Sequence, residues 1–302
     1  MNDYGDPYSL NYVKLSRARV LLSTGDINNA VIALKELEAL YNSQEIGDVS
    51  RAWIINVVLD SYFTQQSGEL FSEITKASPF SQFSSLSREN AIFEIIKLSD
   101  SLADTSTGKL RLASYYANEI FGGGLIDSIK QDYSDQIISL VNESELLFWK
   151  EQSGAIPTKL TRSQIMLFTY RQGYALAAVS SVDKSFIKYY EKKFDEALKM
   201  AADNPDNVIM QQLVPYVNFY YACFILLNKE TGEYLDDQKT VALVNRTIET
   251  GQEPITGSQF RRFITTELSR KEAERNHNYY FIDKLRTAYP QFLAYTNQVL
   301  NP

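Results

Sequence analysis

The sequence predicts an all-α protein built from antiparallel helix hairpins. Apolar residues recur at helical spacing along nearly the whole chain, and no alternating apolar and polar run is long enough for a strand. The 302 residues include only 13 Gly and 8 Pro, too few for the frequent turns of an all-β protein. We expect a single helical domain over residues 1–302 and place any subdivision of it near 151–160.

The first two helices are expected over 12–22 and 28–41, as a hairpin. Residues 23–26 interrupt the apolar pattern between them. Gly25 can adopt the left-handed backbone that follows a helix, and Asp26 is suited to cap the N-terminus of the next one. The second helix places five apolar residues on one face: Ala30, Ala33, Leu34, Leu37 and Leu40.

Apolar stripes and helix breakers place the later helices. Thr161 and Gln164 have the spacing of a capping box. The clearest stripe lies within 183–203 and contains Tyr190 and Phe194. The expected ranges are 50–66, 68–76, 87–103, 108–121, 125–149, 161–180, 183–203, 207–228, 236–250, 258–275 and 278–299.

The helix expected over 207–228 contains no charged residue, and 219–227 is wholly apolar or aromatic. A membrane-spanning helix needs about 20 mostly apolar residues. Gln211, Pro215 and Asn218 interrupt the first half of this segment. We therefore expect a helix buried on all sides and no integral membrane segment.

The N-terminal hairpin also carries a spaced pattern of small and apolar residues, Ala18-x-x-Leu21-Leu22-x-x-Gly25-Asp26-x-x-x-Ala30-x-x-Ala33-Leu34-x-x-Leu37. This pattern resembles a tetratricopeptide repeat (TPR), with Ala18, Gly25 and Ala30 at the small positions of that family. Lys14 stands where the family has an aromatic residue, and the 34-residue period is not kept. The resemblance implies a TPR-like right-handed solenoid and a protein–protein interaction scaffold.

The charge of the chain narrows the classes of partner. A net charge of −7 argues against attraction to nucleic acid or to an anionic membrane. Residues 255–290 differ, because they carry seven basic and four acidic side chains, which could bind an acidic partner. Residues 1–6 lack the pattern of a signal peptide. We expect the cytoplasm by default, and an extracytoplasmic location if a leader preceded this sequence.

The sequence contains few residues suited to catalysis or metal binding. A single cysteine, Cys223, excludes a disulfide framework and a multi-cysteine metal site. We expect Cys223 to be buried and inert, and the single histidine, His277, to lie at the surface or cap a helix. Residues 122–124 form a glycine run without the Lys-Ser/Thr of a phosphate-binding loop. We expect no catalytic residue, cofactor or metal.

The leading functional hypothesis is a non-enzymatic scaffold that binds a protein or peptide on a curved helical surface. The chain has 20 Tyr and 16 Phe, and tyrosine is enriched at binding surfaces. One alternative is a helical extracytoplasmic protein that encloses a small or apolar ligand, and another is an all-α enzyme with converging carboxylates. The residues chosen for partner binding are Tyr115, Tyr116, Tyr189, Tyr220, Arg261, Arg262 and Tyr279. The sequence does not fix the oligomeric state.

Overall fold

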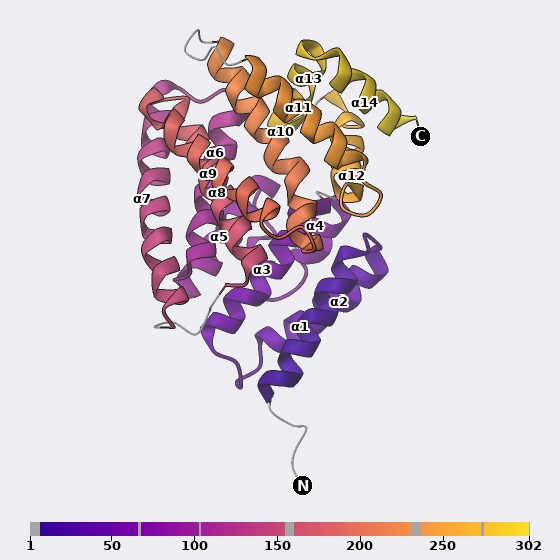
Figure 1. The fold of residues 1–302 in the computed structure, drawn as a ribbon. Coiled ribbons are helices and arrows are strands. Elements are labelled where there is room, and N and C mark those ends of the chain that lie inside the picture. Colours follow the sequence, from indigo (N-terminus) through magenta and orange to yellow (C-terminus); the bar gives the residue numbers. More distant parts are fainter. Residues whose placement is uncertain are drawn as a thin grey trace. The chain divides into compact units, whose positions relative to one another are not determined.

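The computed structural model describes residues 7–65, 68–102, 104–154, 160–230, 237–272 and 275–301 (Figure 1). These residues form fourteen α-helices and two short 3-10 helices and contain no strand. The all-α prediction is therefore confirmed for the described chain.

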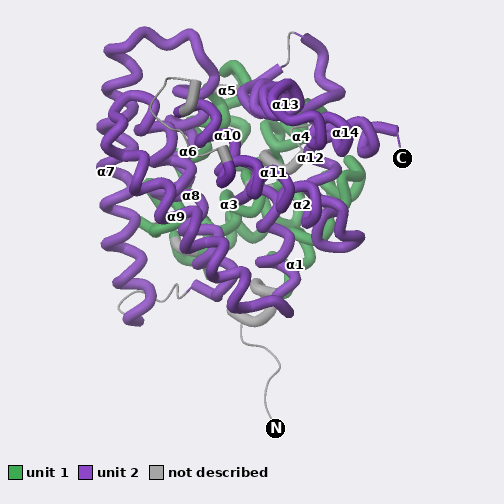
Figure 2. Tube along the Cα trace, turned by 45° about the horizontal axis from the view of Figure 1, so that its top comes forward, with its two compact units in different colours: residues 1–108 green, residues 109–302 purple. Residues whose placement is uncertain are grey.

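The chain divides into two compact units: unit 1 is residues 1–108 and unit 2 is residues 109–302 (Figure 2). Within the region 151–160, where a subdivision was expected, residues 155–159 lie outside those described.

Unit 1 consists of two packed helix pairs and their connections. Helix α1 packs on α2, and α3 packs on α5. Gly25 has a left-handed φ of 74°, and the carboxylate of Asp26 accepts a hydrogen bond from the backbone N–H of Asn28 at 2.8 Å, so both turn predictions are confirmed. The elements are α1 (Pro7–Ser23), α2 (Ile27–Tyr41), α3 (Asp48–Gln65), α4 (Gly68–Ile74), η1 (Phe80–Phe83) and α5 (Arg88–Leu102).

Unit 2 is organised around two buried helices, α8 and α10. Helix α8 packs against α7, α9 and α10, and α10 also packs against α11, α12 and α13. Residues 217–226 of α10 are all buried, as expected for this uncharged segment. The elements are α6 (Ser106–Gly122, in this unit from residue 109), α7 (Asp127–Gln152), α8 (Arg162–Ser180), η2 (Lys184–Phe186), α9 (Ile187–Ala202), α10 (Val208–Glu230), α11 (Asp237–Gln252), α12 (Ser258–Leu268), α13 (His277–Ala288) and α14 (Pro290–Leu300).

Stacked aromatic rings fill the interior of unit 2. Phe121 of α6 stacks on Phe224 of α10, with ring centroids 5.1 Å apart and planes at 18°. Phe194 of α9 stacks on Tyr221 of α10 at 5.0 Å and 21°. The first contact joins helices that are distant in sequence and the second joins consecutive helices, and such pairs stabilise a core beyond the effect of the buried area alone.

The first helix begins at Pro7 and not at residue 12, and two later helices differ more from the prediction. One helix was expected over 278–299, but α13 ends at Ala288 and α14 begins at Pro290. Proline has no backbone N–H and disfavours a helical residue before it, so the helix ends there; Tyr289 is extended, with φ −129° and ψ 103°. The helix expected over 258–275 ends at Leu268.

No described helix combines the length and the apolar character that crossing a bilayer requires. The uncharged segment of α10 instead lies within the core of unit 2.

Candidate interaction surface

Four of the five predicted binding tyrosines lie wholly or partly at the surface, three of them on α6 and α9. Tyr115 and Tyr116 are half-buried on α6, and the Tyr116 ring packs against Tyr133 of α7 with centroids 4.9 Å apart. Tyr189 of α9 is exposed, and the ammonium group of Lys188 lies 5.2 Å from its ring centroid. Tyr115 meets Tyr116 edge to face with ring centroids 6.0 Å apart, whereas Tyr189 lies on another helix, α9.

Tyr220 and Tyr279 have different environments. Only 7% of Tyr220 is exposed, and its hydroxyl donates a hydrogen bond to Oδ1 of Asn278 at 2.7 Å, so this residue belongs to the core and not to a surface. Tyr279 is half-buried, and the guanidinium of Arg275 lies 4.2 Å from its ring centroid. The adjacent residue, Tyr280, is the exposed one of the two.

The two predicted arginines do not act as a pair. Arg261 donates to the backbone carbonyls of Gly251 and Glu253, at 2.6 and 2.8 Å, and to that of Pro254 at 3.1 Å. Its guanidinium therefore fastens the turn between α11 and α12. Arg262, the next residue, is exposed.

A surface that the sequence analysis missed lies on α7, at the left edge of Figure 1. One face of this helix is buried and carries Ser134, Ile137, Leu140, Val141, Ser144, Leu147 and Glu151. Seven residues at alternating spacings of four and three positions are all exposed. We call them the α7 stripe: Ser128, Asp132, Asp135, Ser139, Asn142, Leu146 and Trp149.

The C-terminal end of the α7 stripe is apolar and rigidly supported. Leu146 is 59% exposed and Trp149 is 64% exposed, and residues three positions apart are neighbours on a helix. The neighbouring ring of Phe148 stacks on Phe168 of α8 at 4.7 Å, and Trp149 meets Phe148 edge to face at 5.4 Å. A large exposed indole is thus held on a fixed helix.

Acidic side chains surround this apolar end. Helix α7 carries six acidic and two basic residues. Glu143 forms an ion pair with Lys109 at 3.3 Å, and Glu145 is 3.9 Å from Lys193. Asp132 and Asp135 are exposed members of the stripe, and Oδ1 of Asp135 accepts a hydrogen bond from Gln131 at 2.9 Å.

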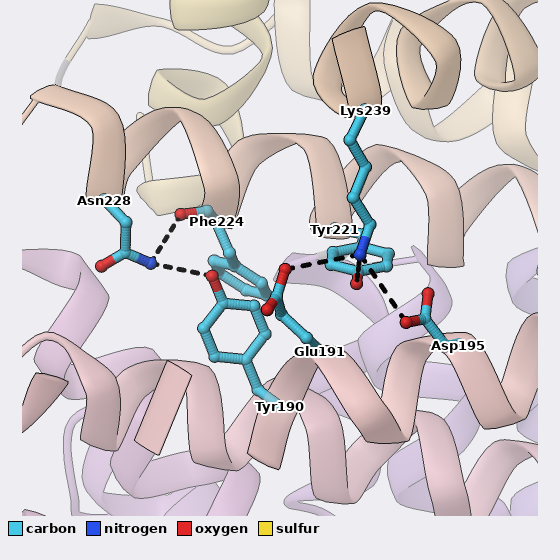
Figure 3. Close-up of polar contacts among 7 residues, drawn as sticks. All are labelled: Tyr190, Glu191, Asp195, Tyr221, Phe224, Asn228 and Lys239. Atoms are coloured by element: carbon cyan, nitrogen blue, oxygen red, sulfur yellow. Dashed lines mark hydrogen bonds and ion pairs between the residues drawn. The ribbon is translucent and has the colours of Figure 1, made fainter. Parts of the chain in front are cut away.

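A polar cluster around Lys239 fastens α11 to α9 and α10 (Figure 3). The ammonium of Lys239 hydrogen-bonds the Tyr221 hydroxyl and lies 4.6 Å from the centroid of that ring. It also lies 3.4 Å from a carboxylate oxygen of Glu191 and 3.6 Å from one of Asp195. The two carboxylates and the Tyr221 ring therefore hold Lys239 in a cluster of ion pairs between α9, α10 and α11.

Asn228 lies two turns after Tyr221 on α10 and links this helix to α9 and η2 (Figure 3). Its amide nitrogen donates to the Tyr190 hydroxyl at 2.8 Å and to the backbone carbonyl of Phe224 at 2.9 Å. Its oxygen accepts from Lys184 at 3.2 Å. Lys184 of η2 therefore links that element to α10.

His277 is the first residue of α13 and is half-buried among aromatic rings; the N-cap of this helix is Asn276, so His277 is neither fully exposed nor the cap. Its Nε2 is 3.1 Å from the Tyr174 hydroxyl, and that hydroxyl donates to Oδ1 of Asn118 at 2.8 Å. The rings of Phe121 and Phe281 lie 6.4 and 5.8 Å away. Desolvation, with a smaller contribution from Arg270, lowers the pKa of His277 to about 4, so the imidazole is neutral at pH 7.

Other ionisable groups of this interior are also held uncharged or paired. Burial raises the pKa of Tyr174, of Tyr220 and of the Cys223 thiol well above their ordinary values. A protonated thiol is a poor nucleophile, as was expected for Cys223. The carboxylate of Glu267 accepts from the Nε of Arg270 at 2.6 Å and from a terminal nitrogen of that residue at 3.0 Å.

Among the described residues, no group of three or more His, Cys, Asp or Glu side chains is arranged to hold a metal ion. Comparison of the chain with protein-family models, with curated proteins and with solved structures finds no match.

Proposed function

We propose that this chain is a non-enzymatic scaffold, with hairpins stacked in a TPR-like manner, that binds a partner protein or peptide on the α7 stripe. The observation that carries the proposal is the pair of exposed apolar residues, Leu146 and Trp149, on the outer face of a 26-residue helix. Tryptophan is enriched among the residues that dominate binding energy at protein interfaces.

The energy available at this position is sufficient for a specific contact. A buried aromatic side chain covers roughly 150–250 Å². Covering the exposed part of Trp149, 64% of the residue, is therefore worth about 3 kcal/mol at about 25 cal/mol per Å². The edge contact with Phe148 already restricts the indole in part, which reduces the entropy that is lost when a partner orders it.

The alternative of a protein that encloses an apolar ligand needs an internal cavity. The described interior of unit 2 is instead occupied by stacked rings such as Phe121 on Phe224. Two hollows among the described residues, of about 610 and 490 Å³, are lined by residues 203–209 and by the charged face of α9. These observations favour the binding scaffold over the enclosed ligand.

Site-specific photo-crosslinking in the cells that make the protein tests the proposal. A benzophenone amino acid at Asn142 lies in the α7 stripe and leaves Leu146 and Trp149 intact, and the matched control places it at the exposed Gln298 of α14. We expect a discrete protein adduct from position 142 and none from 298. The adduct should disappear when Leu146→Ser and Trp149→Ser are added.

Two results would contradict the proposal. One is an identical set of adducts from both positions. The other is an adduct at position 142 that survives the loss of both apolar residues. Circular dichroism of each variant checks that the helices are intact, as expected for substitutions at exposed positions.

A further inference from the structure

We infer that the α7 stripe binds a basic amphipathic helix, which carries Lys or Arg along one half of its contact face and apolar residues along the other. This inference rests on the proposed function and adds the chemical class of the partner. The occupant follows from the spacing, the polarity and the charge of the stripe.

The spacing of the stripe matches a helical partner. Its members alternate at four and three positions, so they lie on one face of α7, and a second helix can lie along such a face. From Asp132 to Trp149 the stripe runs about 26 Å at 1.5 Å per residue. A partner helix of about 18 residues covers that length.

The polarity of the stripe changes along its length. Leu146 and Trp149 form the apolar C-terminal end, whereas Asp132 and Asp135 form an acidic N-terminal part. Asn142 lies between them. A helix with apolar side chains at one end of its seam and cations at the other is complementary to both parts.

The charge around the stripe selects against acidic partners. Glu143 and Glu145 border the apolar end, and both are about half exposed despite their ion pairs. Lys130 is paired with Asp127 at 3.4 Å, and Lys150 is the other basic residue of α7. An acidic segment on this face would meet like charges, which costs affinity and slows association.

A fluorescence titration of the full chain tests the inference. The chain has two tryptophans, Trp53 and Trp149, so Trp53→Phe leaves Trp149 as the only indole. The probe is a synthetic helix of about 18 residues with Leu along one half of its seam, Lys along the other, and Ala and Gln elsewhere. Its counterpart has Glu in place of every Lys.

We expect the Lys peptide to bind saturably and to shift the emission of Trp149 to shorter wavelength, because the indole becomes covered. The Glu peptide should bind at least about tenfold more weakly. Affinity for the Lys peptide should fall as the ionic strength rises, since exposed charges are screened.

Two pairs of Asp→Asn substitutions, which remove the same charge at different places, separate a local effect on affinity from an effect of the net charge of the chain. Asp132→Asn with Asp135→Asn should weaken the Lys peptide about tenfold, because two exposed ionic contacts are lost. Asp203→Asn with Asp206→Asn removes the same charge from an exposed loop of the same unit and should change the affinity by less than about twofold.

Four results would overturn the inference. The first is that the Lys peptide does not bind, and the second is that both peptides bind equally. The third is that the two pairs of variants lose the same affinity. The fourth is a Trp149 emission that depends on protein concentration without peptide, which would indicate a second copy on the stripe. If the peptide fails but the crosslink at Asn142 persists and requires Trp149, the binding function stands and only the class of partner is wrong. If the crosslink also fails, both are wrong.

Discussion

Hydrogen bonds of single residues in the interior of unit 2 determine the tautomer of His277. The Tyr174 hydroxyl donates its one proton to Asn118, so its oxygen must accept from His277. His277 is therefore the Nε2–H tautomer, and its Nδ1 carries the lone pair. A proton added at Nδ1 would place a cation among Phe121 and Phe281, near Arg270.

The single histidine allows a direct pH test. The pKa of His277 lies near 4, below its ordinary value of 6.5, so between these pH values only the unfolded chain takes up the proton. The free energy of unfolding should therefore fall as the pH is lowered from 6.5 to 4, by up to about 3 kcal/mol. In NMR the lone imidazole signal should titrate below pH 5 and show the Nε2–H tautomer.

His277→Gln is the control for that experiment. The glutamine amide can still donate to Tyr174 but has no proton to gain, so this variant should lack the histidine part of the pH dependence measured by urea unfolding. A titration midpoint near 6.5 in the folded protein, or an unchanged slope in His277→Gln, would contradict the assignment of a buried neutral imidazole.

The roles of other single residues depend on partners that are remote in sequence. Tyr220 meets Asn278, 58 positions away, and Arg261 is occupied by carbonyls of a turn before α12. Composition and spacing locate tyrosines and arginines but do not indicate which of them is already bonded. That is why the sequence analysis included Tyr220 and Arg261 among binding residues.

At the scale of the helices, local chemistry made most boundaries predictable. Thr161 and Gln164 form the expected capping box, because a cap depends on residues only three positions apart. Pro290 carried an equally local signal for the end of α13, and the sequence analysis did not use it. The α7 stripe could have been predicted from helical spacing, because that spacing places Trp149 on the face of the helix opposite the buried Ile137 and Ser144.

The packing of α11 against α14 depends on a glycine. A Cβ added at Gly251 would meet the Tyr295 hydroxyl and lie 3.1 Å from Cζ of that residue and 3.2 Å from Cδ1 of Phe260. The Tyr295 hydroxyl finds no hydrogen-bond partner among the described residues, and burial raises its pKa to about 12. Close approach, and not a special backbone conformation, therefore requires glycine at this position.

Gly251→Ala should lower the free energy of unfolding by about 1–3 kcal/mol, because overpacking exceeds the gain in helix propensity. Gly122→Ala is the control, since nothing lies within 4 Å of its added Cβ, and it should leave stability unchanged or slightly raised. In a Tyr295→Phe background the loss should shrink by about 1 kcal/mol, because the clashing oxygen is gone. Urea unfolding of the four variants measures this coupling, and equal losses in both backgrounds would exclude the clash.

At the scale of the whole molecule, each compact unit has its own buried core. In unit 1 the core includes Leu37, Ile55 and Ile95, whereas in unit 2 it includes Phe194 and Ile282. The sequence analysis expected one helical domain, and apolar periodicity alone cannot divide a run of helices, because every helix shows the same kind of stripe. The division depends on which stripes face one another.

Unit 2 should fold without unit 1. A fragment of residues 104–302 keeps α6 complete and exceeds the size at which a single core stabilises a domain, so we expect a cooperative urea transition and an unchanged His277 signal. A fragment of 127–302 lacks α6, and with it Asn118 and Phe121, which contact Tyr174 and His277. Its imidazole signal should move and its transition should broaden. A longer fragment that behaves like the shorter one would show that the core of unit 2 needs residues before 104.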